Sequence, residues 1–375
     1  MDKIEIYIDE LLEKSTPDRP IWNIEKILQG LKSTWNYIDG CMIKAILEMY
    51  AITKDEKYFR FADNFIDCKV REDGSIEGYS VEELNIDNVN AGKTLFELYD
   101  LTGKEKYRKA IDLVYSQIEQ MPRTAEGNFW HKNIYPNQVW LDGLYMCQPF
   151  YMEYETRFHE KKNYDDIFRQ FFNVVEHMRD PKTGLYYHAY DSSREMFWCD
   201  KVTGLSQNFW LRALGWYSMA LLDTLDKADA SVGEPYERLK KVFVDLMDAM
   251  LKYQDASGMW YQVVNMGGRE KNYLETSGSS IMAYAILKGV RLGYLPESYR
   301  EYAEKAIDGI CAKYLKTDEG EMSLGGICLV AGLGGNGRRS GTYDYYMSEP
   351  IVEDDAKGVG PFLLAYTEML AYKNR

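Results

Sequence analysis

The stretch EMYAITKDEKYFRFADNFI (residues 48–66) returns 49 residues later, in a related form, as ELYDLTGKEKYRKAIDLVY (residues 97–115). Glu, Tyr, Thr, Glu, Lys and Tyr hold the same places in both copies. A repeat of this kind is typical of a fold built from one supersecondary unit. The apolar residues of the second copy share one helical face: Tyr107, Ala110, Ile111, Val114, Tyr115 and Ile118. The repeated unit is therefore predicted to be a turn followed by an amphipathic helix.

Further copies of this unit indicate how many helical hairpins the fold contains. A Tyr that opens a helix after a turn recurs at Tyr164, Tyr236 and Tyr299. The helices before these turns are richer in apolar and small residues, and each has a capping residue near its start. They are expected to begin near Asp39, Asn88, Val139, Gln207, Thr276 and Asp354. The pattern predicts an all-α closed ring of six helical hairpins, with the segment from Trp22 to Trp35 as the outer partner of the last inner helix.

The composition is that of a folded protein. Hydrophobic residues make up 46% and charged residues 28% of the 375 residues. No break in composition separates one part of the chain from another, so residues 1–375 are predicted to form a single domain. The short apolar run ICLVA, from Ile327, is expected to be a strand within a long loop.

The net charge excludes two classes of partner. The formal charge is -14, which opposes attraction to nucleic acid and to anionic lipid. No apolar stretch is long enough to span a membrane, and Asp2, Glu5 and Asp9 stand where a signal peptide would be basic and apolar. We therefore expect a cytoplasmic protein with no nucleic-acid or membrane partner. The sequence makes no prediction of an oligomeric state.

Metal and nucleotide motifs are absent or incomplete. The chain has four His and six Cys without a CxxC pair, so no metal site is predicted. GLGGNG, from Gly332, matches the dinucleotide fingerprint, but it is followed by RRSGTYDYY rather than by an apolar helix. We interpret it as a flexible loop carrying Arg338 and Arg339, each either an anion contact or a solvated charge. No cofactor is predicted.

In a ring of hairpins, the starts of the inner helices and the loops before them converge on one rim, where they can form a cleft. HKNIYPNQVWLDGLYM (residues 131–146) places Asp142 at such a start. Trp140 and Leu141 beside it would desolvate the acid and raise its pKa, as a general acid requires. The alternative interpretation is that Asp142 only caps the helix.

Two more segments place polar groups on the same rim. In ELNIDNVNAGKTL (residues 83–95), Asp87 either caps a helix or faces Asp142 as a second carboxylate. In NFWLRALGWYSMALLD (residues 208–223), Arg212 and Trp216 lie at positions i and i+4 of one helical face. A guanidinium beside aromatic rings suits a sugar carboxylate, because Arg forks its donors onto the two oxygens while rings pack on the sugar. The alternative is a structural Arg among core Trp residues.

These segments, with NYLETSGSSIMAYAILKG (residues 272–289) and YYMSEPIVEDDAKGVGPFLLA (residues 345–365), resemble the unsaturated rhamnogalacturonyl hydrolases, glycoside hydrolase family 105. The resemblance covers nearly the whole chain, and WLDG with WxRAxGW is shared mainly with the related unsaturated glucuronyl hydrolases. It implies an (α/α)6 barrel, in agreement with the count of hairpins.

The resemblance also implies a reaction and a set of site residues. In the family, the aspartate matching Asp142 protonates C4 of a C4=C5 unsaturated uronic acid and then, as conjugate base, assists the addition of water at C5. The hemiketal that forms opens and releases the neighbouring sugar. Asp87 matches the second aspartate of the family's site. The residues expected to bind substrate are Tyr37, His131, Lys132, Tyr135, Trp140, His188, Trp210, Arg212 and Trp216.

The predicted function is therefore the removal of unsaturated uronic acid from short pectin-derived oligosaccharides, with Arg212 or Lys132 holding the uronate. Two alternatives stay open. The first is an unsaturated glucuronyl hydrolase acting on other polysaccharide-lyase products, which would differ in the sugar beyond the uronate. The second is a helical-repeat sugar-binding protein without activity, because a hairpin pattern alone does not demand catalysis.

Overall fold

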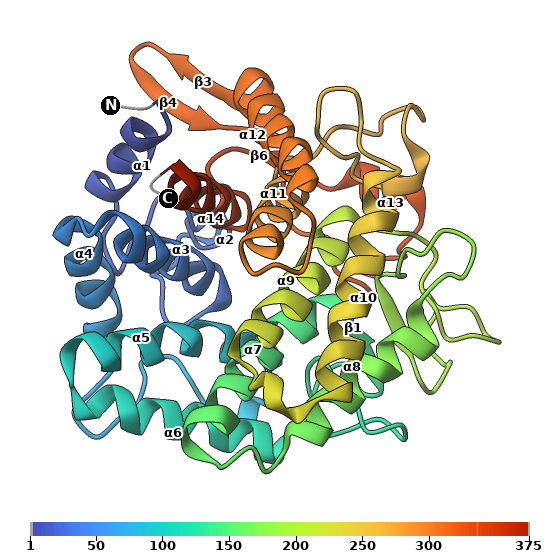
Figure 1. Ribbon diagram of the computed structural model, residues 1–375, viewed down its shortest axis with the longest axis horizontal. Helices are drawn as coiled ribbons and strands as arrows, with labels where there is room; N and C mark the ends of the chain where they lie inside the picture. Colours follow the sequence, from blue (N-terminus) through green and yellow to red (C-terminus); the bar gives the residue numbers. More distant parts are fainter. Residues whose placement is uncertain (1–2, 336, 374–375) are drawn as a thin grey trace.

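The computed structural model describes residues 3–335 and 337–373, and within them 14 α-helices are arranged around a ring (Figure 1). The inner helices are α3 (Tyr37–Thr53), α5 (Lys93–Thr102), α7 (Leu141–Phe158), α9 (Leu211–Lys227), α11 (Thr276–Arg291) and α14 (Ala356–Lys373). The 3-10 helix η2 (Ile86–Gly92) precedes α5 and contacts both α3 and α7. The ring closes because α14 contacts both α11 and α3. This confirms the predicted all-α (α/α)6 barrel.

Five outer helices each follow an inner helix and pack on it. They are α4 (Glu56–Asp67), α6 (Glu105–Gln120), α8 (Tyr164–Met178), α10 (Glu234–Leu251) and α12 (Arg300–Tyr314). On α6 the apolar face predicted from the repeat is buried throughout. Every residue of α11 from Thr276 to Val290 is buried, because an inner helix is enclosed by its neighbours. Small residues allow this close packing: a Cβ on Gly278 would lie 2.3 Å from the Cγ of Leu211.

The sixth outer helix is α1 (Lys3–Glu13), so the prediction that the segment from Trp22 to Trp35 takes this place is wrong. Tyr366 of α14 donates a hydrogen bond of 3.1 Å to Glu5 of α1. The segment 22–35 contains only the six-residue helix α2 (Ile24–Gln29), which has no buried residue. Helix α1 can pack on the barrel because its buried residues recur with a helical period and so share one face. They are Ile4, Tyr7, Ile8 and Leu11.

Short antiparallel strand pairs join the loops at the ends of the helices. They are β1 (Gln138–Trp140) with β2 (Ala189–Asp191), β3 (Leu315–Asp318) with β4 (Glu321–Leu324), and β5 (Ile327–Cys328) with β6 (Ile351–Val352). The strand expected at Ile327 is therefore confirmed as β5. The remaining short elements are α13 (Tyr343–Ser348) and the 3-10 helices Val81–Glu83, Ala230–Val232, Val264–Met266 and Glu297–Tyr299.

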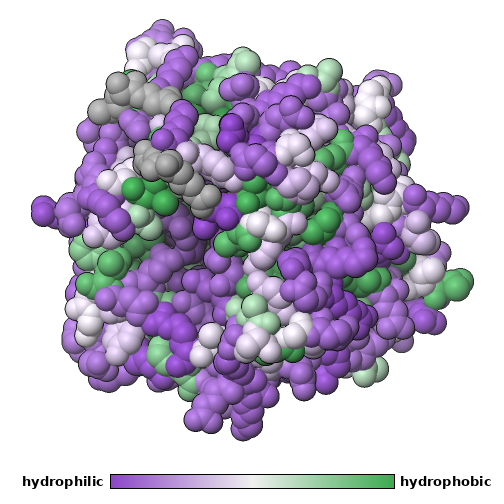
Figure 2. Space-filling model, in the orientation of Figure 1, coloured by the Kyte–Doolittle hydropathy of each residue, from purple (hydrophilic) through white to green (hydrophobic). Residues whose placement is uncertain are grey.

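The face of the molecule seen down its shortest axis is largely polar (Figure 2). The face in Figure 2 is mostly hydrophilic, with hydrophobic residues in small, separate groups. Within residues 3–335 and 337–373, no helix combines the length and the apolar character that crossing a membrane requires.

Candidate active site

A pocket opens where the starts of the inner helices converge. Ten of the eleven residues that the sequence predicts for the site lie in its lining: Tyr37, Asp87, His131, Lys132, Tyr135, Trp140, Asp142, Trp210, Arg212 and Trp216. The eleventh, His188, is fully buried behind Asp142, with its Nε2 atom 3.3 Å from the Oδ2 atom of Asp142. The six further lining residues are Glu25, Met146, Val330, Ala331, Gly332 and Arg339.

Asp142 lies in the first turn of α7, directly after strand β1. The pairing of β1 with β2 fixes this start, and the Leu141 amide donates to the His188 carbonyl at 3.1 Å. The N-cap residue of α7 is Trp140, and no side-chain hydrogen bond caps the helix. The Oδ2 atom of Asp142 is buried without a hydrogen-bond partner in the described part of the chain. Asp142 therefore does not act as a cap, and its carboxyl group faces the pocket.

Asp87 and Lys132 form an ion pair that is largely but not fully buried, with side chains 13% and 22% exposed. The Asp87 carboxylate lies 2.7 Å from the Nζ atom of Lys132 and 3.4 Å from the Nε2 atom of His131. Burial alone would raise the pKa of Asp87, but the charge and hydrogen bond of Lys132 together with the nearby His131 outweigh it and hold the pKa below its usual value. Burial lowers the pKa of His131 to about 4 despite the nearby Asp87, so this ring is neutral near neutral pH. The cap of η2 is the side chain of Asn85, so Asp87 is not a cap either.

Replacing Lys132 by Met is expected to destabilise the fold by roughly 1–2 kcal/mol near neutral pH, because Asp87 then stays largely buried without its partner. Since the pKa of Asp87 is lowered in the folded state, the pair stabilises above the pKa of an unfolded Asp. This contribution is lost as the pH falls through the lowered value. Urea unfolding at neutral and acidic pH measures both effects. The double variant D87N/K132M is expected to recover most of the loss, and a K132M variant as stable as wild type would contradict the prediction.

Arg212 is a buried guanidinium in the wall of the pocket. Its side chain donates to Ser277 Oγ at 3.3 Å, to the carbonyl of Leu329 at 3.3 Å and to the carbonyl of Cys328. It also lies 4.8 Å from the ring centroid of Trp210. In residues 3–335 and 337–373 no carboxylate lies within ion-pair distance of it. A buried guanidinium stays charged, so an anionic ligand would compensate it.

Arg339 supplies a second guanidinium at the rim. It donates to the Tyr135 hydroxyl at 3.2 Å and to the Gly334 carbonyl at 3.3 Å. It packs over Gly332, where an added Cβ would lie 2.5 Å from its Nη1 atom. Its neighbour Arg338 is exposed and lies over the Phe197 ring. Of the two loop arginines, Arg339 is therefore the one that reaches the pocket.

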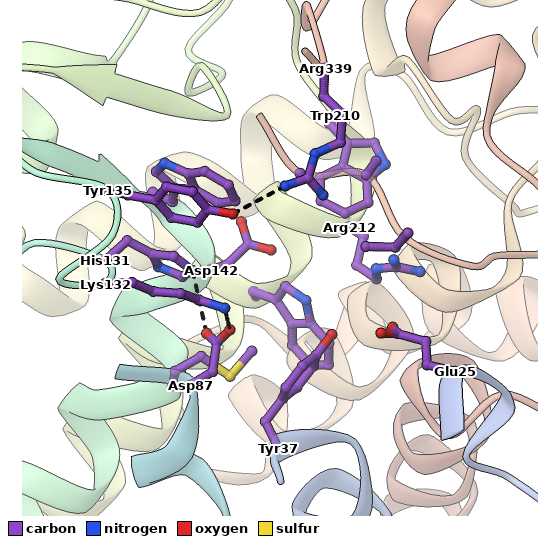
Figure 3. Close-up of a pocket in the computed structure, with 16 residues that line it drawn as sticks. Glu25, Tyr37, Asp87, His131, Lys132, Tyr135, Asp142, Trp210, Arg212 and Arg339 are labelled. Carbon is purple, nitrogen blue, oxygen red and sulfur yellow. Dashed lines mark hydrogen bonds and ion pairs between the residues drawn. The ribbon is translucent and has the colours of Figure 1, made fainter. Parts of the chain in front are cut away.

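Aromatic rings form one wall beside these charges. Tyr135 stacks on Trp140 with centroids 5.2 Å apart, and Trp140 stacks on His131 at 4.5 Å. Figure 3 shows Asp87 on one side of the pocket, with the Asp142 carboxyl group above it, and Arg212 on the opposite side. A flat ligand with one anionic group fits this combination of parallel rings and opposed charges.

Sequence reasoning missed residues whose place depends on distant contacts. Glu25 belongs to the short helix α2, and its carboxylate is held 2.8 Å from Lys357 of α14. The hydroxyl group of Tyr346, in α13, forms a 2.7 Å hydrogen bond with His188 Nδ1. Nothing in the local pattern of either segment points to the pocket.

Several known proteins are similar to this chain in sequence and in fold. Residues 13–373 match the model of Glycosyl Hydrolase Family 88. A structure from C. acetobutylicum ATCC 824, described as a glycoside hydrolase from family 105, is 45% identical, with a TM-score of 0.90 and coverage of 100% of this chain and 99% of that chain. The unsaturated rhamnogalacturonyl hydrolase YesR of Bacillus subtilis is 26% identical over 312 residues, which are 82% of this chain and 83% of YesR. An unsaturated glucuronyl hydrolase from Bacillus sp. GL1 shares the fold at 15% identity. Its TM-score is 0.65, and the match covers 92% of this chain and 88% of that chain.

Proposed function

The chain belongs to the glycoside hydrolases of families 88 and 105, and on this premise we propose that it hydrolyses short unsaturated oligosaccharides derived from rhamnogalacturonan. It would release the unsaturated uronic acid from the non-reducing end. One observation carries the proposal: Asp142, whose Oδ2 atom makes no hydrogen bond in the described residues, shares a pocket with the buried guanidinium of Arg212, which has no described carboxylate within ion-pair distance. A terminal unsaturated uronate needs both groups, a proton donor for its double bond and a cation for its carboxylate.

In the proposed reaction Asp142 gives its proton to C4, and the electron pair of the C4=C5 bond forms the new C–H bond. The positive charge that develops at C5 is shared with the ring oxygen. Water adds to C5 and transfers a proton to the Asp142 carboxylate, which restores the acid. The hemiketal at C5 then opens to a ketone, and the resulting hemiacetal at C1 collapses and releases the next sugar. One water molecule is consumed, and no covalent enzyme intermediate forms.

Arg212 is the proposed ligand of the uronate carboxylate. The sequence left Arg212 and Lys132 as alternatives, and Lys132 is already paired with Asp87 at 2.7 Å. Some guanidinium donors of Arg212 remain after its contacts with Ser277 and two carbonyls. Trp210 beside it would pack on the apolar face of the sugar.

The experiment that tests the proposal follows the ultraviolet absorbance of the conjugated C4=C5 bond. Purified protein is mixed with an unsaturated galacturonyl-rhamnose disaccharide and, in parallel, with an unsaturated glucuronyl disaccharide. We expect faster loss of absorbance with the first substrate. Faster loss with the second would favour an unsaturated glucuronyl hydrolase, and folded protein without activity on either would contradict the proposal.

A further inference from the structure

Two buried side chains, Tyr346 and His188, and the buried Oδ2 atom of Asp142 form a chain of polar groups behind the pocket. The Tyr346 hydroxyl lies 2.7 Å from His188 Nδ1, and His188 Nε2 lies 3.3 Å from Asp142 Oδ2. Tyr346 and His188 are fully buried, so no solvent reaches either group. His188 therefore contacts the back of the Asp142 carboxyl group, while the other carboxyl oxygen is left for a ligand.

The hydrogen atoms in this chain can be placed by elimination. A neutral imidazole has one N–H donor and one bare nitrogen acceptor. In the described part of the chain, His188 Nδ1 is the only hydrogen-bond partner of the Tyr346 hydroxyl. If Nδ1 carried the hydrogen, the phenol would accept it and its own hydrogen would be buried without an acceptor, which is costly. With Tyr346 as donor, the phenol hydrogen and the bare Nδ1 atom are both satisfied, and the hydrogen of the neutral His188 ring is placed on Nε2.

This tautomer suits the proton donor. His188 Nε2 and Asp142 Oδ2 are both buried without a partner at their present separation of 3.3 Å. Catalytic hydrogen bonds are often long without ligand and tighten when substrate binds. An Nε2–H group directed at Oδ2 leaves Oδ1 free to carry the proton toward the pocket. After the proton has left, the same N–H group stabilises the negative charge on the carboxylate.

We infer that Tyr346 is a positioning residue that fixes His188 in the Nε2–H tautomer, so that His188 donates to Asp142 during proton transfer. The inference rests on the proposed function for its role in the reaction, but the tautomer itself does not depend on the substrate. It gives His188 a place in the proton chain rather than in the lining of the pocket, and it explains why a phenol 158 residues away in sequence is buried against this ring.

The first test is the tautomer in the protein without substrate. Protein labelled with nitrogen-15 at its histidines has four rings to distinguish, His131, His159, His177 and His188. The nitrogen chemical shifts of His188 are expected to show a protonated Nε2 and a bare Nδ1. In the Tyr346→Phe variant we expect a mixture of tautomers. A protonated Nδ1 in wild type, or an unchanged His188 in the variant, would overturn the inference whatever the substrate proves to be.

The second test is kinetic and uses the unsaturated galacturonyl-rhamnose disaccharide. Tyr346→Phe is expected to lower kcat roughly 10- to 100-fold, as a part of general acid catalysis, with little change in KM. The control is Tyr343→Phe on the same helix, which loses hydrogen bonds to the Glu270 carbonyl at 2.7 Å and the Arg269 carbonyl at 3.4 Å and should keep its kcat. A lower kcat with an unchanged tautomer would mean a structural role and overturn the inference. A wild-type protein without activity would instead contradict the proposed function and leave the tautomer test in force.

Discussion

Replacing Asp142 by Asn is expected to lower kcat by roughly 100- to 10,000-fold, the share that general acid catalysis contributes. The amide keeps the shape of the carboxyl group but cannot release a proton to C4. Oδ2 of Asp142 makes no hydrogen bond in the described residues, and the amide oxygen of Asn can take its place 3.3 Å from His188 Nε2, so the substitution costs the fold little. Thermal stability and the affinity for the disaccharide are therefore expected to change little. Initial rates, thermal unfolding and calorimetric binding measure the three effects separately.

The matched control is Asp165→Asn. Asp165 lies in the first turn of the outer helix α8, as Asp142 lies in the first turn of α7, and it is exposed. Both variants replace a carboxyl group in the first turn of a helix by an amide, so any general effect of this change at a helix start appears in both. If the two variants kept the same activity and differed from wild type only in stability, Asp142 would be a residue of the helix start and the proposed role would fail.

The ring of hairpins could be predicted because its repeat is carried by local patterns. The spacing of apolar residues from Tyr107 to Ile118 predicts one helical face, and α6 buries these residues. The outer partner of α14 could not be found in the same way. Trp22 and Trp35 are both buried, but they lie outside the short α2, while α1 buries a regular face at the start of the described chain. Buried aromatic residues identify core positions and do not by themselves identify a helix.

The pocket was predictable because one rule places most of its residues. The starts of inner helices meet on one rim, so Asp87, Asp142 and Arg212 come together although they are far apart in sequence. The sequence could not show which group each of the two cationic side chains, Lys132 and Arg212, contacts in the folded protein. That Lys132 pairs with Asp87, while Arg212 bonds to carbonyls of the loop after β5, depends on tertiary contacts.

Other site residues carry no signal in the sequence. Arg338 and Arg339 are identical neighbours, and only the backbone of their loop decides that Arg339 packs over Gly332 and reaches Tyr135. Tyr346 is one of 31 tyrosines, and its importance appears only when α13 is placed against His188.

Replacing Arg212 by Gln is expected to lower kcat/KM roughly 100-fold on the unsaturated galacturonyl-rhamnose disaccharide. A forked, charge-assisted contact with a carboxylate is among the strongest that a protein makes. The loss should depend on the charge of the ligand. Comparing the disaccharide acid with its uncharged methyl ester is therefore the more specific test. Wild type is expected to prefer the acid, and Arg212→Gln to lose most of that preference. The ratio of kcat/KM for acid and ester, compared between proteins, cancels the intrinsic difference between the two substrates.

Two comparisons separate the carboxylate contact from the structural contacts of Arg212 with Cys328 and Leu329. Arg212→Lys keeps the charge but not the fork, so it should recover part of the preference for the acid. Arg339→Gln tests the guanidinium at the rim, with the exposed Arg338→Gln as its control. If Arg339→Gln abolished the preference for the acid and Arg212→Gln retained it, the uronate carboxylate would bind at the rim. Arg212 would then serve only to hold the loop after β5 against the barrel.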